Sequence, residues 1–93
     1  MDRTVRRAEA GQEQGDDVAR LRARLEALVA SDPLAALELS AQVEALGRAA
    51  AADAAAAACG QGASWSDVGN AFGISKQAAH QRFAKHVKTA RRR

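Results

Sequence analysis

Apolar side chains recur along residues 16–31 with the period of an α-helix. Charged side chains lie mostly between them, so one face of the predicted helix is apolar and the other is polar. Asp16 and Asp17 place negative charge at the start, where the helix dipole favours it. We therefore expect an amphipathic helix that begins near Asp16. Its apolar positions, at spacings of three, four and three residues, are Val18, Leu21, Leu25 and Leu28.

A second helical pattern starts at Ser31-Asp32-Pro33 and continues to about Cys59. Proline is favoured at the first position of a helix, and Ser31 or Asp32 precedes it as a cap. So short a connection predicts an antiparallel helical hairpin. The large apolar positions of this second helix are Leu34, Leu37, Leu39, Val43 and Leu46.

Residues 64–84 predict two shorter helices around a tight turn. Ser64 and Asp67 have the spacing of a capping box, so the first of these helices should run from Trp65 to about Phe72. Gly73 can adopt the positive φ that ends a helix, and the residues at the junction must be small or apolar. The residues that meet this requirement are Trp65, Val68, Gly69, Phe72, Gly73, Ile74, Ala79 and Phe83.

These patterns predict an all-α fold, with an N-terminal antiparallel helical hairpin followed by a C-terminal helix-turn-helix. Strong helix formers dominate the composition and β-branched residues are scarce. We expect a disordered arm over 1–15, the hairpin over 16–60 and the helix-turn-helix with a basic tail over 61–93. Because a core of Ala and Leu is thin and the helices are long, we expect the hairpin to form a homodimer through the apolar positions given above.

The charge is divided unevenly along the chain. Residues 1–60 carry seven Arg and ten acidic residues, whereas residues 61–93 carry seven Lys or Arg and one acidic residue, Asp67. No acidic residue follows Lys76. This distribution favours a polyanionic partner for the C-terminal part, although a solvated basic tail would have the same composition.

The second short helix, over about residues 75–88, offers side chains suited to the major groove of DNA. Gln can bond adenine through two atoms, and Lys can reach guanine. The candidate base-reading residues are Ser75, Lys76, Gln77, His80 and Gln81. Contacts to phosphate do not depend on base sequence. The candidates for those contacts are Ser64, Arg82, Lys85, Lys88, Arg91, Arg92 and Arg93.

The stretch WSDVGNAFGISKQAAHQRF resembles the helix-turn-helix of small DNA-binding proteins common in high-GC Gram-positive bacteria. More distantly, it is similar to the promoter-reading helix-turn-helix of sigma factors. The close resemblance covers residues 63–83 and implies a DNA-binding role for the five base-reading candidates. Arg82 departs from the broader pattern, which commonly has an apolar residue there, and we expect Phe83 to take over that packing.

Two interpretations of function follow. The first is a double-stranded DNA-binding protein, either a transcription regulator or a small nucleoid-associated protein. The alternative is a protein-interaction module, in which the hairpin docks on another protein, such as a transcription complex, and the basic helix is solvated. No catalytic constellation is visible, so we expect no enzyme. His80 and His86 are not at the spacing of four residues that would share a helix face, so we expect no metal site. We also expect no cofactor, and the Ala-rich core predicts no pocket for a small-molecule ligand.

Cys59 is the only cysteine, which excludes an intramolecular disulfide. We expect it to be a small buried residue, with a redox-active thiol or an intersubunit disulfide as the alternatives. The N-terminus has no apolar segment of the secretory type, and no apolar run approaches the length of a membrane span. We therefore expect a soluble cytoplasmic protein, associated with the nucleoid and not with a membrane.

Overall fold

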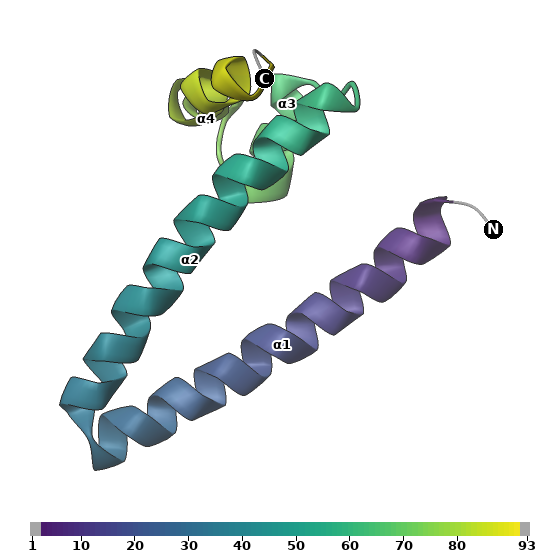
Figure 1. The fold of residues 1–93 in the computed structure, drawn as a ribbon. Coiled ribbons are helices and arrows are strands. Elements are labelled where there is room, and N and C mark those ends of the chain that lie inside the picture. Colours follow the sequence, from purple (N-terminus) through teal and green to yellow (C-terminus); the bar gives the residue numbers. More distant parts are fainter. Residues whose placement is uncertain (1–2, 92–93) are drawn as a thin grey trace. The chain divides into compact units, whose positions relative to one another are not determined.

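The computed structural model describes the backbone of residues 3–91 and the side chains of residues 11–91. The described backbone is helical apart from short connections, and it contains no strand (Figure 1). The helices are α1 (Arg3–Ser31), α2 (Pro33–Gly60), α3 (Trp65–Phe72) and α4 (Lys76–Arg91). The predicted all-α class is therefore confirmed for the described residues. None of these helices has both the length and the apolar character that a membrane crossing requires.

Helix α1 begins at Arg3, so the predicted helix start near Asp16 was wrong. Residues 3–15 of the arm that we expected to be disordered are helical, and residues 1–2 lie outside the described residues. Those residues are rich in Arg, Ala, Glu and Gln, all of which have high helix propensity. Gly11 and Gly15 each cost roughly 1 kcal/mol relative to Ala in a helix. Unlike proline, however, glycine keeps the backbone N–H that the helical hydrogen bond needs. A helix can therefore continue where the apolar stripe is missing.

Asp32 alone separates α1 from α2, and it is the cap of α2. Its carboxylate accepts a hydrogen bond from the N–H of Ala35 at 3.2 Å, and its carbonyl accepts one from the N–H of Ala36 at 3.0 Å. Ser31, the other candidate, instead donates its hydroxyl to the carbonyl of Ala27 at 3.0 Å. The predicted start of α2 at Pro33 is confirmed.

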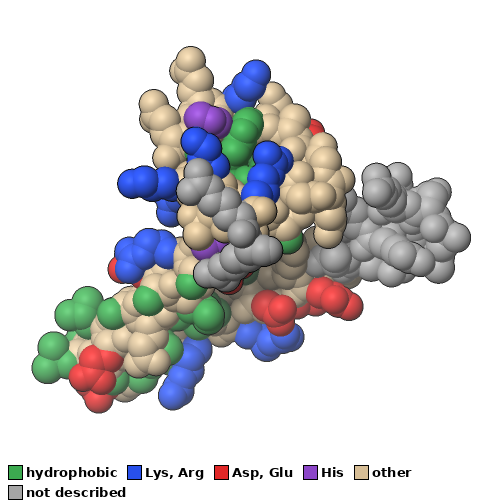
Figure 2. All heavy atoms as spheres, turned by 45° about the horizontal axis from the view of Figure 1, so that its top comes forward, with side chains coloured by type: hydrophobic (Ala, Val, Ile, Leu, Met, Phe, Trp, Pro, Cys, Tyr) green, Lys and Arg blue, Asp and Glu red, His purple; other side chains and the backbone are tan. Residues whose placement is uncertain are grey.

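The chain divides into two compact units, which we call the first unit (Met1–Val43) and the second unit (Glu44–Arg93). Much of the large apolar surface of the first unit is open to solvent. Leu34 is 72% exposed and Leu37 is 66% exposed. Figure 2 shows hydrophobic side chains on the surface around the junction of α1 and α2. Five of the predicted dimer positions are half-buried, namely Leu21, Leu25, Leu28, Leu39 and Val43, and four are exposed, namely Val18, Leu34, Leu37 and Leu46.

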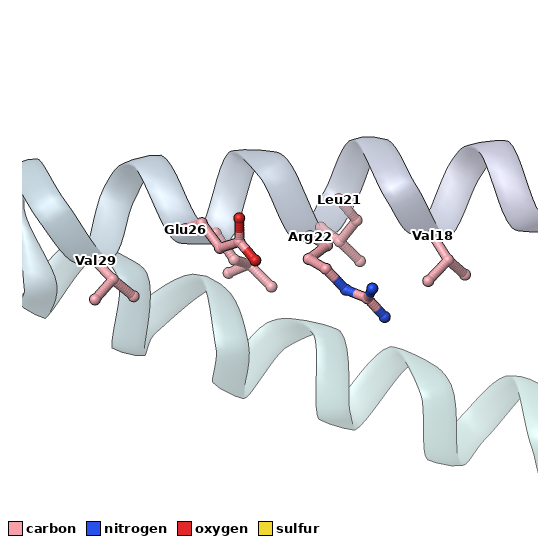
Figure 3. A pocket seen from close by; sticks show the side chains of 6 residues that line it. Val18, Leu21, Arg22, Glu26 and Val29 are labelled. Atoms are coloured by element: carbon pink, nitrogen blue, oxygen red, sulfur yellow. The ribbon is translucent and has the colours of Figure 1, made fainter.

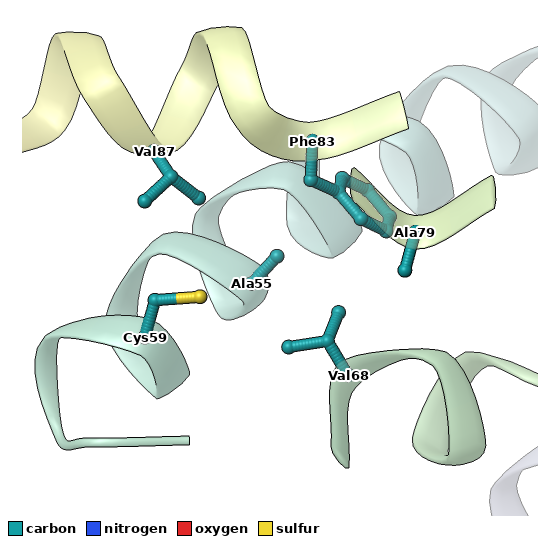
Figure 4. Packing of buried hydrophobic residues seen from close by; sticks show 6 residues of the cluster. All are labelled: Ala55, Cys59, Val68, Ala79, Phe83 and Val87. Carbon is teal, nitrogen blue, oxygen red and sulfur yellow. The ribbon is translucent and has the colours of Figure 1, made fainter. Parts of the chain in front are cut away.

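The second unit has a buried apolar core, to which α2, α3 and α4 all contribute (Figure 4). Its members are Ala55, Cys59, Val68, Ala79, Phe83 and Val87. The last part of α2 thus packs with α3 and α4, and this unit begins at Glu44 and not at the predicted boundary after residue 60. The alanine-rich run 49–59 permits this packing because short side chains allow close helix approach. Cys59 is buried, as expected.

Candidate nucleic-acid interface

Ser64 and Asp67 fix the start of α3 by bonding each other's backbone. The Ser64 Oγ accepts a hydrogen bond from the N–H of Asp67 at 3.0 Å, and the Asp67 carboxylate accepts one from the N–H of Ser64 at 2.9 Å. The predicted capping box is confirmed. The carboxylate of Asp67 places negative charge at the helix start, which disfavours a phosphate there.

The turn between α3 and α4 consists of Gly73, Ile74 and Ser75. Gly73 has φ +77° and ψ 30°, a left-handed conformation that glycine adopts without the strain of a Cβ. Ile74 donates its N–H to the carbonyl of Gly69 at 2.9 Å, which closes α3. Ser75 caps the start of α4, because its Oγ accepts a hydrogen bond from the N–H of Ala78 at 3.1 Å. The turn predicted at Gly73 is confirmed.

Gly69 lies where α3 and the turn approach each other most closely. A Cβ at this position would lie 2.7 Å from the carbonyl oxygen of Ile74 and 3.0 Å from that of Ser75. Both neighbours are backbone atoms, which cannot rotate away as a flexible side chain would. The prediction that a small residue is needed here is confirmed.

The inner face of α4 anchors this helix to the core of the second unit. Ala79 has no exposed surface, and Phe83 and Val87 are also buried. Trp65 and Ile74 are half-buried against the same core. Helix α4 is therefore held along most of its length, and its opposite face stays at the surface.

Phe72, one of the apolar residues predicted at the junction, is 44% exposed. Its ring stands edge-to-face against Phe83, with the ring centroids 5.5 Å apart. The guanidinium of Arg82 covers Phe72, with Cζ 4.8 Å from the ring centroid. Phe72 thus lies at the edge of the junction, where a cation covers its ring.

Arg82 stands at the position where the broader pattern commonly has an apolar residue. Phe83 is 3% exposed, which confirms that it takes the packing role. Arg82 itself is exposed and lies near the rings of both Phe72 and Phe83. These cation–π contacts hold its charge at one edge of α4. Arg82 therefore remains at the surface as a candidate for phosphate contact.

The predicted base-reading residues all lie at the surface of the second unit. Ser75, Lys76, Gln77, His80 and Gln81 are exposed, as are the predicted phosphate contacts Lys85, Lys88 and Arg91. Figure 2 shows Lys and Arg side chains around a His side chain on the visible face of this unit. No carboxylate of the described residues pairs with these cations. Arg92 and Arg93 lie outside the described residues.

Each of the two histidines contacts a side chain that the sequence did not indicate. His80 meets Trp65 edge-to-face, with centroids 5.1 Å apart and the ring planes at 82°. His86 Nε2 lies 3.1 Å from Oδ1 of Asp53 on α2, and both side chains are exposed. Asp53 is the only charged residue in the run 49–59, and this isolation is the one sequence feature that could have suggested a partner for it.

We compared the chain with protein-family models, with curated proteins and with solved structures, and none of the three comparisons gave a match. The functional argument therefore rests on the packing and the charges of the second unit.

Proposed function

We propose that the chain binds double-stranded DNA through a helix-turn-helix formed by α3, the turn at Gly73–Ser75 and α4, with α4 in the major groove. One observation carries the proposal. Helix α4 is anchored by Ala79, Phe83 and Val87 on its inner face, and its exposed positions hold amides and cations without any acidic residue from Lys76 onward. A fixed helix with such a face suits the major groove of B-DNA, which is wide enough to admit an α-helix.

The exposed residues divide into two roles in this proposal. Lys76, Gln77 and Gln81 are the long side chains near the start of α4, where recognition helices contact base edges. His80 and the hydroxyl of Ser75 lie beside them. Further along the helix and at its edge, the cations supply contacts to phosphate that do not depend on sequence. These cations are Arg82, Lys85, Lys88 and Arg91, together with Arg92 and Arg93.

We further propose that α1 and the start of α2 form a helical hairpin that joins two copies of the chain. The exposed Leu34 and Leu37 favour a protein partner, because scattered small patches are normal on a monomer but several large exposed apolar residues on one short segment are not. Figure 3 shows Val18 and Val29 on α1, in an open hollow of about 440 Å³. A two-fold dimer would place two recognition helices on half-sites about 34 Å apart. Both a transcription regulator and a small nucleoid-associated protein fit this arrangement.

Selection of bound duplexes from a random DNA pool tests the proposal. We expect a palindromic motif, and we expect Lys76→Ala or Gln77→Ala to relax the base preference at one position of each half-site. Arg91→Gln should instead weaken binding to all sequences together and reduce the salt slope by about 1. The absence of any gel shift, even at about 50 mM salt, would contradict DNA binding.

The exposed leucines also favour a second candidate function, a protein-interaction module that uses the first unit to dock on a different protein. In that case α4 is a solvated basic helix. A monomer that gives no gel shift at either about 50 mM or about 200 mM salt would support this candidate.

A further inference from the structure

The second unit contains a hollow of about 390 Å³ in which the end of α2, the start of α3 and the second half of α4 meet. This volume lies within the usual range of small-molecule pockets, roughly 300–1,000 Å³. Its lining combines an apolar base, two aromatic rings and a cationic rim. The residues that matter here are Cys59, Trp65, His80, Lys85, Lys88 and Arg91.

Among the described residues, the cations at the rim have no carboxylate partner. None of the described residues that line the hollow carries a carboxylate, and no ion pair in the described part of the chain involves Lys85, Lys88 or Arg91. The C-terminal end of a helix favours cations, which accounts for their place on α4. However, like charges three residues apart on a helix repel one another. An anion bound at this rim would relieve the repulsion.

The aromatic wall selects the shape of such an anion. Trp65 and His80 stand at 82° to each other, with centroids 5.1 Å apart, so their rings form a corner and not a single flat stack. Trp65 is half-buried, and the buried Cys59 lies beside it in the lining. A flat ring fits against such a corner, because aromatic pairs favour edge-to-face and offset-stacked contacts.

We propose that this hollow binds a small aromatic carboxylate, with its ring against Trp65 and its carboxylate at Lys88 and Arg91. The guanidinium of Arg91 matches the two oxygens of a carboxylate in a way that a single ammonium does not. A consequence follows, which rests on the proposed DNA binding. Because Lys85, Lys88 and Arg91 are also the candidates for phosphate contact, the bound carboxylate competes with DNA and releases it.

Trp65 is the only tryptophan of the chain, so its fluorescence reports directly on the hollow. The experiment titrates the full-length protein with benzoate, and separately with benzamide, which has the same shape but no charge. We expect a saturable change with benzoate and at least about tenfold weaker binding of benzamide, which corresponds to about 1.4 kcal/mol. Equal binding of the two compounds, or no saturable change with benzoate, would overturn the proposal.

Matched variants locate the contact. Lys88→Gln and Arg91→Gln should each weaken benzoate binding at least about fivefold, because each removes a charge from the rim. Lys76→Gln removes a charge from the same helix outside the hollow and should leave benzoate binding unchanged. All three side chains are exposed, so the fold tolerates these changes. If Lys76→Gln weakens benzoate binding as much as Lys88→Gln does, benzoate is attracted to the whole basic face of α4. The proposed binding site in the hollow would then be wrong.

Competition is measured separately from binding to the hollow. The anisotropy of a labelled duplex is followed as benzoate replaces acetate at constant ionic strength, so that only the ring differs between the two salts. We expect benzoate to release the duplex and acetate to leave it bound. Benzoate that binds near Trp65 without changing the anisotropy would overturn the competition alone. The fluorescence titration contains no DNA, so it tests carboxylate binding in the hollow even if the chain fails to bind DNA.

Discussion

The second unit buries Phe83 and Val87 against the ends of α2 and α3, whereas the first unit leaves Leu34 and Leu37 open to solvent. The first unit nevertheless has more leucines. What differs is that the small residues of the second unit lie in one shared core, whereas Ala36 is the only buried hydrophobic residue among the described residues of the first unit. The second unit has Ala55, Ala79 and Gly69 where its helices meet, and their short side chains let the backbones approach closely.

The comparison teaches that burial in a small helical chain depends on close approach as much as on apolar volume. A short chain buries a small share of its surface, and the surplus apolar area must be covered by another molecule or stay exposed. In our proposal a second copy covers it. The predictions below test whether the two units differ in this way.

The largest effect is expected from the aromatic pair of the second unit. Phe83→Ala should lower the free energy of unfolding by roughly 3–5 kcal/mol, because it removes a large buried side chain and leaves a cavity. Phe72→Ala should cost clearly less, since that ring is already partly in solvent. Urea denaturation of both variants measures the difference. Equal losses would mean that Phe83 is not the centre of this core.

The next effect concerns the open face of the first unit. Replacing both leucines, Leu34→Gln and Leu37→Gln, should weaken self-association about 100-fold, or about 2.8 kcal/mol, as measured by sedimentation equilibrium. Gln42→Ala changes an exposed polar position of the same helix and serves as the control. A wild-type chain that remains monomeric at high micromolar concentration would contradict the dimer.

Two glycines provide a matched pair with opposite expected signs. Gly69→Ala should destabilise the second unit by roughly 1–3 kcal/mol, because the added Cβ meets two backbone oxygens. Gly47→Ala lies in the interior of α2 with open space around it, and it should stabilise the chain by up to about 1 kcal/mol. Thermal melts should show shifts of roughly 4–8 °C per kcal/mol. A neutral Gly69→Ala would show that the turn can move.

The smallest effect is expected from the loss of a helix cap, and the cost in stability should be similar in the two units. Ser64→Ala and Asp32→Ala each remove a helix cap, and each should cost about 1 kcal/mol, since capping is local and does not depend on the surrounding core. Hydrogen exchange at the first turns of α2 and α3 would measure each loss separately. A much larger loss for one of them would show that its cap also supports tertiary packing.

Local chemistry made the helices around the candidate site predictable from the sequence. The bounds of α3 follow from the Ser64 and Asp67 pair and from Gly73, because each acts within one turn of its own position. Ala79 and Phe83 could be assigned to the inner face for a similar reason, since the helical period fixes which residues share a face. The start of α2 at Pro33 is another result of this kind.

Contacts between distant segments were not predictable in this way. The pair of Asp53 and His86, and the meeting of Cys59 with Trp65 at one hollow, depend on where the end of α2 lies against α4. No local period encodes that placement. The reach of α1 to Arg3 was missed for a different reason, because propensity alone extends this helix and the prediction relied on apolar spacing.

The close contact at Gly69 has a consequence for how this chain can vary in evolution. Every other amino acid carries a Cβ, so any substitution at Gly69 drives an atom toward the carbonyl of Ile74. Exposed neighbours such as Gln77 and Gln81 have no such restriction. Sequence change should therefore accumulate on the outer face of α4, where in our proposal it alters which DNA is bound, and be purged at Gly69, where it alters how α4 is held.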